Sequence, residues 1–471
     1  MLDAALLDRL IKAYDVRGVV PDDLTPEIAR LVGAAFVRVV GAATADGGPG
    51  TVVIGRDMRP SGPTLVAAFA EGVTSQGVDV LLIGLASTDQ LYYAAGSLDL
   101  PGAMFTASHN PAQYNGIKLC RVGASPVGQD SGLSTIKALV LEWSQTGIPA
   151  YDGPAGTVTE RDLLGDYAEY LNGLVPLGAS RRLSVVIDAG NGMGGHTVPA
   201  VLDGLPLDIT PLYFDLDGTF PNHEANPIDP ENLRDLQAKV LEVGADLGLA
   251  FDGDADRCFV VDERGEIVDP STLTALIAVR ELGKHPGSTI IHNLITSAAV
   301  PEIVREHGGV PVRTRVGHSF IKATMAETGA VFGGEHSGHF YFRDFWRADS
   351  GMLAALHTLA ALGETPEGTT LSSLLAQYQR YVASGEINTT VADQAAVVAE
   401  IKALYGPREG VTLDELDGLT VTGSTDAQTW WFNVRASNTE PLLRLNVEGA
   451  DTALMTSVRD DVLAIIRGGS R

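Results

Sequence analysis

The chain has few residues of several kinds, and each shortage excludes a class of protein. It contains only two cysteines, Cys120 and Cys258, in 471 residues. Two cysteines are far too few for a disulfide framework, so we expect a reducing compartment. Lysine and arginine together number 33 against 59 aspartates and glutamates, which gives a formal net charge of -26. This acidic balance argues against nucleic acids and anionic membranes as partners, because both are themselves negative.

The sequence also lacks the segments that take a protein into or across a membrane. No uninterrupted apolar run reaches membrane-spanning length. The N-terminal segment carries Asp3 and Asp8 where a signal peptide would have positive charge followed by an apolar run. We therefore expect a cytoplasmic protein with no membrane partner.

What the sequence does contain is typical of a globular protein with several cores. Hydrophobic residues make up 45% and charged residues 20% of the chain, and its length predicts about three or four domains. Short β-branched runs at 51–54, 184–187 and 288–291 are each followed by a turn and a segment of helical character. Such runs are typical of strands buried on both faces, so we expect three α/β units with parallel or mixed sheets.

The last hundred residues have a different pattern. Helical segments at 371–382 and 395–405 precede strand-like runs at 419–422, 429–434 and 442–447, and a helix is expected over 452–466. This order predicts a smaller α+β domain with an antiparallel sheet. Stretches rich in proline and glycine at 148–156 and 363–368 are linker candidates. With a boundary placed at an acidic cluster, we predict domains over 1–150, 151–256, 257–368 and 369–471.

A serine loop in the first predicted domain is a candidate for nucleophilic chemistry. Residues 106–111 read TASHNP, after the short apolar run 101–105 and before the Asn-Gly pair at 115–116. Ser108 therefore stands where a strand breaks into turns, on an exposed loop that a reacting group can reach. The alternative is that Ser-His before Asn-Pro is ordinary loop punctuation, and the segment alone does not decide between the two.

An acidic loop lies between two apolar runs and predicts a metal site. Asp252, Asp254 and Asp256 alternate with small residues, so their oxygens can surround one hard cation such as Mg²⁺. An EF-hand is the rival interpretation, because Glu263 falls at the twelfth position of such a loop. However, Arg257 occupies the sixth position, which needs glycine, and the flanking runs look like strands rather than helices. A strand-loop-strand metal site is favoured over an EF-hand or a solvated acidic turn.

Two further loops carry groups suited to sugar and phosphate. Residues 333–339 read GGEHSGH, in which Glu335 and Ser337 can bind neighbouring sugar hydroxyls. Residues 435–441 read RASNTEP and offer a guanidinium, hydroxyls and an amide to a phosphate. The alternatives are a flexible polar loop in the first case and a Ser-Asn turn with Arg435 on the surface in the second.

With these four segments in this order, the chain resembles the α-D-phosphohexomutase superfamily, most closely its bacterial phosphomannomutase/phosphoglucomutase type. The resemblance runs essentially from end to end and includes YDVRG at 14–18, NGIK at 115–118 and FPNH at 220–223. It implies three related α/β domains with mixed sheets and a smaller C-terminal α+β domain, arranged around a central cleft. In domain order, these would carry the phosphoserine loop, the metal-binding loop, the sugar-recognition loop and a phosphate-binding site.

The resemblance also implies an activity and its ligands. The expected enzyme is an intramolecular phosphotransferase that interconverts hexose 1-phosphate and hexose 6-phosphate, with mannose or glucose as the sugar. It works through a phosphoserine enzyme and a hexose 1,6-bisphosphate that is both intermediate and activator. Mg²⁺ is the expected cofactor, phosphorylated hexoses are the expected partners, and we expect a monomer or weak homodimer.

Residue roles follow from the same resemblance. The phosphate oxygen on Ser108 would join Asp252, Asp254 and Asp256 around the metal. Lys118 and His339 are candidates for general acid and base. The other implied catalytic residues are Arg17 and Arg257 near the transferring phosphate and His109, which would shape the serine loop. The implied substrate-binding residues are Tyr14, His318, Glu335, Ser337, Arg435, Ser437, Asn438 and Thr439.

One departure from the family pattern leaves the sugar open. Related mutases often have a lysine in the turn that here reads NLITS at 293–297, and Arg313 or Arg315 is a candidate replacement. The loop carries His336 where the glucosamine branch more often has glutamine, which favours mannose or glucose. The alternatives are a phosphoglucosamine mutase, a catalytically silent sugar-phosphate-binding protein and a phosphatase in which water discharges the phosphoserine.

Overall fold

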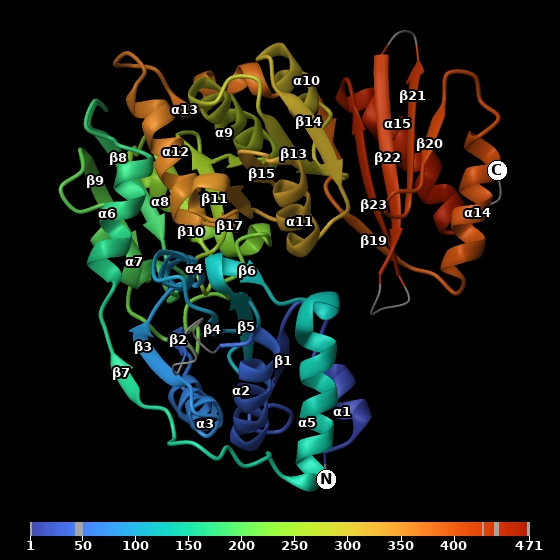
Figure 1. Ribbon diagram of the computed structural model, residues 1–471. Helices are drawn as coiled ribbons and strands as arrows, with labels where there is room; N and C mark the ends of the chain where they lie inside the picture. The colour runs from blue at the N-terminus through green and yellow to red at the C-terminus, as the bar shows by residue number, and fades with distance from the viewer. Residues whose placement is uncertain (1, 43–49, 426–427, 438–441, 469–471) are drawn as a thin grey trace. The chain divides into compact units, whose positions relative to one another are not determined.

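The computed structural model describes residues 2–42, 50–425, 428–437 and 442–468. The chain divides into two compact units, and each is described by itself. The first unit comprises Met1–Leu273 and Ser337–Leu374, and the second comprises Thr274–His336 and Leu375–Arg471. The elements named below carry the same labels in Figure 1.

The first sheet of the first unit is built on a parallel centre. Strand β2 (Thr51–Arg56) pairs in parallel with β3 (Asp79–Leu85) and β4 (Gly102–Phe105). β5 (Tyr114–Arg121) runs antiparallel to β4 and to β1 (Val16–Val19), and β7 (Val158–Glu160) extends the other edge. Helices α2 (Pro26–Val40), α3 (Gly62–Thr74) and α5 (Ser134–Thr146) share a hydrophobic core with these strands.

Helix α2 begins at Pro26, and the local sequence explains why. Thr25 is its N-cap and accepts a hydrogen bond from the backbone N–H of Ile28 through Oγ1, with Pro26 in the first turn. The side-chain cap satisfies an N–H that has no partner within the helix, and proline loses nothing at this position. Gly41 then ends the helix in the left-handed conformation, with φ of 61°.

The second sheet of this unit repeats the arrangement. Its strands follow the order β12 (Ile267–Val268), β11 (Cys258–Asp262), β10 (Leu247–Phe251), β8 (Leu183–Asp188) and β9 (Leu207–Leu212). β8 pairs in parallel with β9 and β10, whereas β10 and β11 are antiparallel. Helices α6 (Leu164–Leu174), α7 (Gly194–Val201) and α8 (Arg234–Val243) belong to this part of the unit.

The second unit contains the third copy of the parallel centre. β13 (Thr289–Asn293) pairs in parallel with β14 (Val310–Thr314) and β15 (Phe332–Gly334). Its connections use α10 (Ala299–Glu306) and α11 (His318–Thr328). The orders β3-β2-β4, β9-β8-β10 and β14-β13-β15 are the same, so the predicted three-copy α/β organisation is confirmed. The remaining strands β16 (Phe340–Phe342) and β17 (Ala348–Asp349) and helix α12 (Gly351–Gly363) lie in the first unit.

The C-terminal part of the second unit is the predicted α+β domain. Its antiparallel sheet follows the order β18 (Val382–Ala383), β23 (Leu442–Gly449), β22 (Gln428–Ala436), β21 (Leu419–Thr425) and β20 (Thr412–Asp414), and β19 (Ile387–Thr390) also pairs with β23. Helices α14 (Gln394–Tyr405) and α15 (Thr452–Ile466) share its core, and α15 is the dark red helix beside the sheet in Figure 1.

Two expectations for this region differ in outcome. The helix predicted over 452–466 is present with those bounds. The helix predicted over 371–382 is wrong in length: α13 covers only Leu371–Leu375, a 3₁₀ turn follows at Ala376–Tyr378, and Val382 already pairs with Gly449 as a strand. Pairing with a distant strand overrides local helix preference there.

Both cysteines are buried, and neither forms a disulfide bond among the described residues. Among the helices of the described residues, none combines the length and the apolar character needed to cross a bilayer.

Candidate active site

Ser108 lies in the loop between β4 and β5, as the sequence predicts. The expectation that this serine is exposed is wrong, because Ser108 is only 5% exposed. Its backbone N–H donates to Thr106 Oγ1 at 2.9 Å, and its φ of 50° is unusual for a residue with a side chain. Such a conformation costs about 1–3 kcal/mol and is common where function requires one side-chain direction. Ser108 Oγ donates to Asp252 Oδ2 at 2.7 Å and lies 3.1 Å from His109 Nδ1. The hydroxyl therefore faces the acidic loop.

The acidic loop joins β10 to β11, so the EF-hand alternative is wrong. The three side chains of Asp252, Asp254 and Asp256 are 0–1% exposed, and one ligand oxygen from each lies within 4.8 Å of the others. Ala255 has φ of 59°, which helps the loop to turn between two paired strands. A Cβ on Gly253 would lie 2.4 Å from the carbonyl oxygen of Ser108, so glycine is what allows the two loops to meet.

Two cations offset the three buried carboxylates. Lys118 Nζ, from β5, donates to Asp254 Oδ2 at 2.7 Å and to Asp256 Oδ2 at 2.6 Å. Arg257 Nε donates to Asp252 Oδ2 at 2.8 Å. Three negative charges thus face two positive ones, so the cluster can accept more positive charge.

Burial and these pairs set the protonation of the groups. Burial raises the pKa of Asp252, against the opposing charge of Arg257. Burial acts upward on the pKa of Asp254 too, but the Lys118 ammonium outweighs it and holds that pKa below the usual range. Burial, followed by the charges of Arg257 and Arg17, lowers the pKa of His109 to about 2, so this imidazole is neutral beside Ser108.

The same cluster fits a divalent cation in its donor chemistry. Carboxylate oxygens are the ligands that Mg²⁺ prefers. Asp254 Oδ1 and Asp256 Oδ1 are buried and have no hydrogen-bond partner in the described parts of the chain, which is costly for an oxygen with no other role. The residues present therefore suit a hard cation held by Asp252, Asp254 and Asp256.

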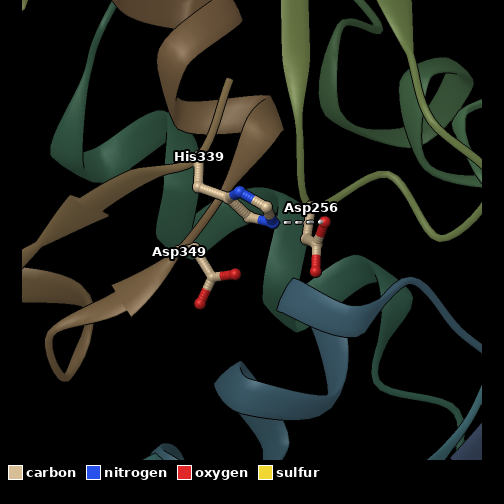
Figure 2. A group of neighbouring side chains, drawn as sticks. All are labelled: Asp256, His339 and Asp349. Carbon is tan, nitrogen blue, oxygen red and sulfur yellow. Dashed lines mark ion pairs between the residues drawn. The ribbon is translucent and has the colours of Figure 1, made fainter. Parts of the chain in front are cut away.

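His339 approaches Asp256 Oδ1, the carboxylate oxygen that does not accept the hydrogen bond from Lys118. Its Nε2 is 3.6 Å from Asp256 Oδ1 and its Nδ1 is 2.8 Å from Ser337 Oγ. Figure 2 shows the imidazole directed at Asp256, with Asp349 of β17 beside both. A ligand atom from each of these three residues lies within 4.8 Å of the others. The structure thus brings His339 and Ser337 to the same cluster as Ser108.

Arg17 and Tyr14 lie at the start of the first sheet. Arg17, in β1, donates to Asn110 Oδ1 and to Asp15 Oδ2, each at 2.5 Å, and so contacts the serine loop. Its Nε atom, like Arg257 Nη2, is buried and has no hydrogen-bond partner among the described residues. Two guanidinium groups that each have a spare N–H suit an anion. Tyr14 is half-buried in the bend that precedes β1.

The second unit holds the other predicted binding residues. Glu335, only 2% exposed, follows β15, and its Oε1 accepts hydrogen bonds from Gly317 N at 3.1 Å and Asn293 Nδ2 at 3.3 Å. His318 begins helix α11 directly after this glycine. The turn that lacks the family's lysine therefore contributes an amide to the predicted sugar loop.

Both arginines proposed as replacements for that lysine already contact another side chain. Arg313 forms an ion pair with Asp414, and the Arg315 guanidinium lies 4.6 Å from the centre of the Phe320 ring. Arg435 lies near the end of β22, with Nη1 3.9 Å from Asp417 Oδ2, while Val316 N donates to the same oxygen.

The remaining predicted phosphate ligands follow Arg435 along the chain. The backbone N–H of Ser437 donates to Leu442 O at 2.9 Å. Asn438 and Thr439 lie outside the described residues.

Two residues in contact with the acidic loop, Thr88 and Asp349, were not predicted as site residues. Thr88, at the start of α4 (Thr88–Ser97), donates through Oγ1 to Asp254 Oδ2 at 2.5 Å and through its N–H to Asp254 O at 3.0 Å. Asp349 joins His339 and Asp256. Both contacts join segments far apart in the chain, and neither residue belongs to a local motif that would have revealed it.

Comparisons with known proteins agree with the succession of three α/β domains and a C-terminal domain. Family models for phosphoglucomutase/phosphomannomutase match four successive segments: α/β/α domain I at residues 8–146, domain II at 166–265, domain III at 269–381 and the C-terminal domain at 386–465. A protein of Xanthomonas campestris named for phosphohexose mutases is 41% identical over 461 residues, covering 97% of this chain and 99% of that protein.

Two further comparisons extend along the whole chain. A phosphomannomutase of Escherichia coli is 39% identical and covers 97% of this chain and 98% of its own length. The crystal structure of a phosphoglucomutase/phosphomannomutase family protein from Burkholderia thailandensis superposes with a TM-score of 0.86 at 32% identity. That match covers 100% of this chain and 99% of the other.

Proposed function

Because this chain belongs to the phosphoglucomutase/phosphomannomutase family, we propose that it interconverts the 1-phosphates and 6-phosphates of mannose or glucose. The observation that supports this most directly is the 2.7 Å hydrogen bond between Ser108 Oγ and Asp252 Oδ2, across 144 residues of sequence. A strained, buried serine hydroxyl against a cluster of carboxylates suits a nucleophile that carries a phosphoryl group beside a cation.

Asp252, Asp254 and Asp256 would hold Mg²⁺ as the cofactor. When bound, the cation supplies positive charge to the oxygens of the transferring phosphoryl group. Arg257 and Arg17 add charged N–H donors near the same point, and Lys118 balances Asp254 and Asp256. Transfer of a phosphoryl group depends mainly on such positioning and charge neutralisation, so this set of residues is suited to the reaction.

In the reaction, Ser108 starts as the phosphoserine. The free hydroxyl oxygen of the hexose phosphate forms a bond to phosphorus while the bond from phosphorus to Ser108 Oγ breaks. The hydroxyl proton passes to a base, for which His339 is the candidate, and Ser108 Oγ takes up a proton as it leaves, with the Lys118 ammonium as the candidate acid. The product is a hexose 1,6-bisphosphate. In the second transfer Ser108 Oγ gives up its proton and forms a bond to the other phosphorus, while the bond from that phosphorus to the sugar oxygen breaks and the released oxygen takes up a proton.

Binding of the sugar and the non-reacting phosphate would fall to the loops. Glu335 and Ser337 suit sugar hydroxyls, and Arg435 with Ser437 suits a phosphate. Asn438 and Thr439 would complete that phosphate site, and Tyr14 and His318 would contact the substrate. These assignments rest on the family resemblance and on the residue types.

The test measures turnover of defined substrates by purified protein with Mg²⁺ and a trace of glucose 1,6-bisphosphate. We expect mannose 1-phosphate and glucose 1-phosphate to be converted to the 6-phosphates, faster than glucosamine 6-phosphate is converted to its 1-phosphate. Release of inorganic phosphate in step with substrate loss would instead indicate a phosphatase. Binding of hexose phosphates without turnover of any of them would indicate a silent binding protein.

A further inference from the structure

An arginine that no mechanism above uses lies fully buried behind the serine loop. Arg59 is 0% exposed and is among the largest side chains buried in the molecule. It belongs to residues 57–61, called here the anchor segment, between β2 and α3 in the first unit. A buried arginine is costly unless its charge and its donors are all matched, so the partners of Arg59 need an explanation.

All five N–H donors of this guanidinium are used: three bind carbonyl oxygens of the serine loop, and a fourth binds that of Tyr114, the first residue of β5. Nη2 donates to the carbonyl oxygens of Ser108 at 2.9 Å and Asn110 at 2.6 Å. Nη1 donates to those of Pro111 at 2.8 Å and Tyr114 at 2.9 Å. The fifth donor, Nε, binds Asp57 Oδ2 at 3.2 Å, which supplies the opposite charge. A planar fork with five donors is a geometry that only arginine offers.

The anchor segment makes a second contact, with Asn115 in β5, shortly after the serine loop. Ser61 Oγ accepts a hydrogen bond from Asn115 Nδ2 at 2.9 Å, and Asn115 Oδ1 in turn accepts from Gly116 N. On its other side, the Arg59 guanidinium lies 5.2 Å from the centre of the Phe220 ring, and a Cβ on Gly218 would lie 2.7 Å from Arg59 Cα. The guanidinium therefore has little freedom to move.

We propose that Arg59 is a positioning residue for phosphoryl transfer, a proposal that rests on the proposed mutase function. It touches neither Ser108 Oγ nor the acidic loop's carboxylates, and it acts by fixing the backbone on both sides of Ser108. That backbone is held at φ of 50°, a conformation that needs support from its surroundings. With Arg59 in place, Ser108 Oγ is kept facing Asp252; without it, the loop can relax and turn the hydroxyl away.

The test compares Arg59→Lys with wild type, using glucose 1-phosphate and mannose 1-phosphate with a trace of glucose 1,6-bisphosphate. Lysine keeps the charge, but one ammonium cannot span four carbonyl oxygens. We expect kcat to fall on the order of 100-fold, the loss typical of a displacement near 1 Å at a reacting group, while KM changes by less than about threefold. Single-turnover transfer from phosphorylated Ser108 to sugar should slow by the same factor as kcat.

Arg121→Lys is the matched control. Arg121 also donates to backbone carbonyls, those of Val39 and Ser131, but away from the serine loop. The Arg121→Lys variant should have a lower melting temperature than wild type and an unchanged kcat. A purely structural role for Arg59 would give the same pattern for Arg59→Lys, with a lower melting temperature and an unchanged transfer rate, and that result would overturn the proposal.

Two further measurements separate failure of the Arg59 proposal from misfolding of the variant and from failure of the proposed function. If Arg59→Lys does not fold, Ser61→Ala decides: loss of the Asn115 hydrogen bond should lower kcat several-fold with KM unchanged, and an unchanged kcat would overturn the proposal. If wild-type protein carries out no transfer from Ser108, the proposed function itself fails. If wild type transfers normally and Arg59→Lys does so equally fast, only the role of Arg59 fails.

Discussion

Replacing Asp89 by asparagine should change how the stability of the first unit depends on pH. Asp89 lies in the first turn of α4, next to Thr88, and is fully buried. Its carboxylate accepts hydrogen bonds from Tyr167 OH at 2.8 Å, from Ser350 Oγ at 2.7 Å and from Ser87 Oγ. Three chain segments therefore meet at one carboxyl group behind the acidic loop.

The sign of the effect follows from the pKa. Burial raises the pKa of Asp89 from 3.8 to about 6, although the three hydroxyls oppose the shift. Between these values the unfolded chain loses the proton and the folded protein keeps it, so stability falls as pH rises through this window. The shift corresponds to roughly 3 kcal/mol in the free energy of unfolding. This stabilisation is fully present below the pKa of Asp89 in the unfolded chain and is lost above pH about 6.

Asp89→Asn removes this titration while keeping the shape of the side chain. Thermal melting of variant and wild type from pH 4 to 7.5 should show the variant gaining relative stability with rising pH. At about 2 °C per kcal/mol, the difference in melting temperature should change by roughly 4–6 °C. Asp22→Asn, on an exposed turn, controls for the loss of one carboxylate. If the difference in melting temperature between Asp89→Asn and wild type stays constant from pH 4 to 7.5, the reasoning is refuted.

Three further predictions concern the site itself. Ser108→Ala should abolish mutase turnover while the melting temperature stays within about 2 °C of wild type; substantial turnover would contradict the nucleophile assignment. Asp254→Asn should abolish the rise in melting temperature that added Mg²⁺ causes in wild type, because a ligand stabilises only the state that binds it; an equal rise in the variant would argue against this metal site. Arg435→Ala should raise KM for hexose phosphates about tenfold or more with kcat changed much less, since a grip on the non-reacting phosphate is uniform binding. An unchanged KM would remove Arg435 from the phosphate site.

The sequence predicted elements well wherever the signal is local. The last helix begins at Thr452, the first residue expected for it, with Asp451 as its N-cap, and Thr25 with Pro26 is a similar local start signal for α2. The strand-loop-strand setting of the three aspartates was also predictable, because apolar runs flank the acidic loop on both sides. These features depend on residues within a few positions of one another.

The contacts that the sequence could not reveal are long-range. Lys118 reaches Asp254 across 136 residues, Asp89 reaches Ser350 across 261, and Arg59 binds carbonyl oxygens about 50 residues away. Backbone carbonyls carry no sequence signature, so nothing in the pattern distinguishes Arg59 from a surface arginine. The same physics explains the shortened helix after residue 371, where pairing with β23 decides the structure.

The central claim is that Ser108 carries the phosphoryl group beside the carboxylate cluster. Peptide mass analysis of purified protein, before and after incubation with glucose 1,6-bisphosphate and Mg²⁺, tests it most directly. We predict one phosphoryl group on Ser108 after incubation, lost to sugar when excess mannose 1-phosphate or glucose 1-phosphate is added. An active mutase whose Ser108 remains unmodified throughout would contradict the account.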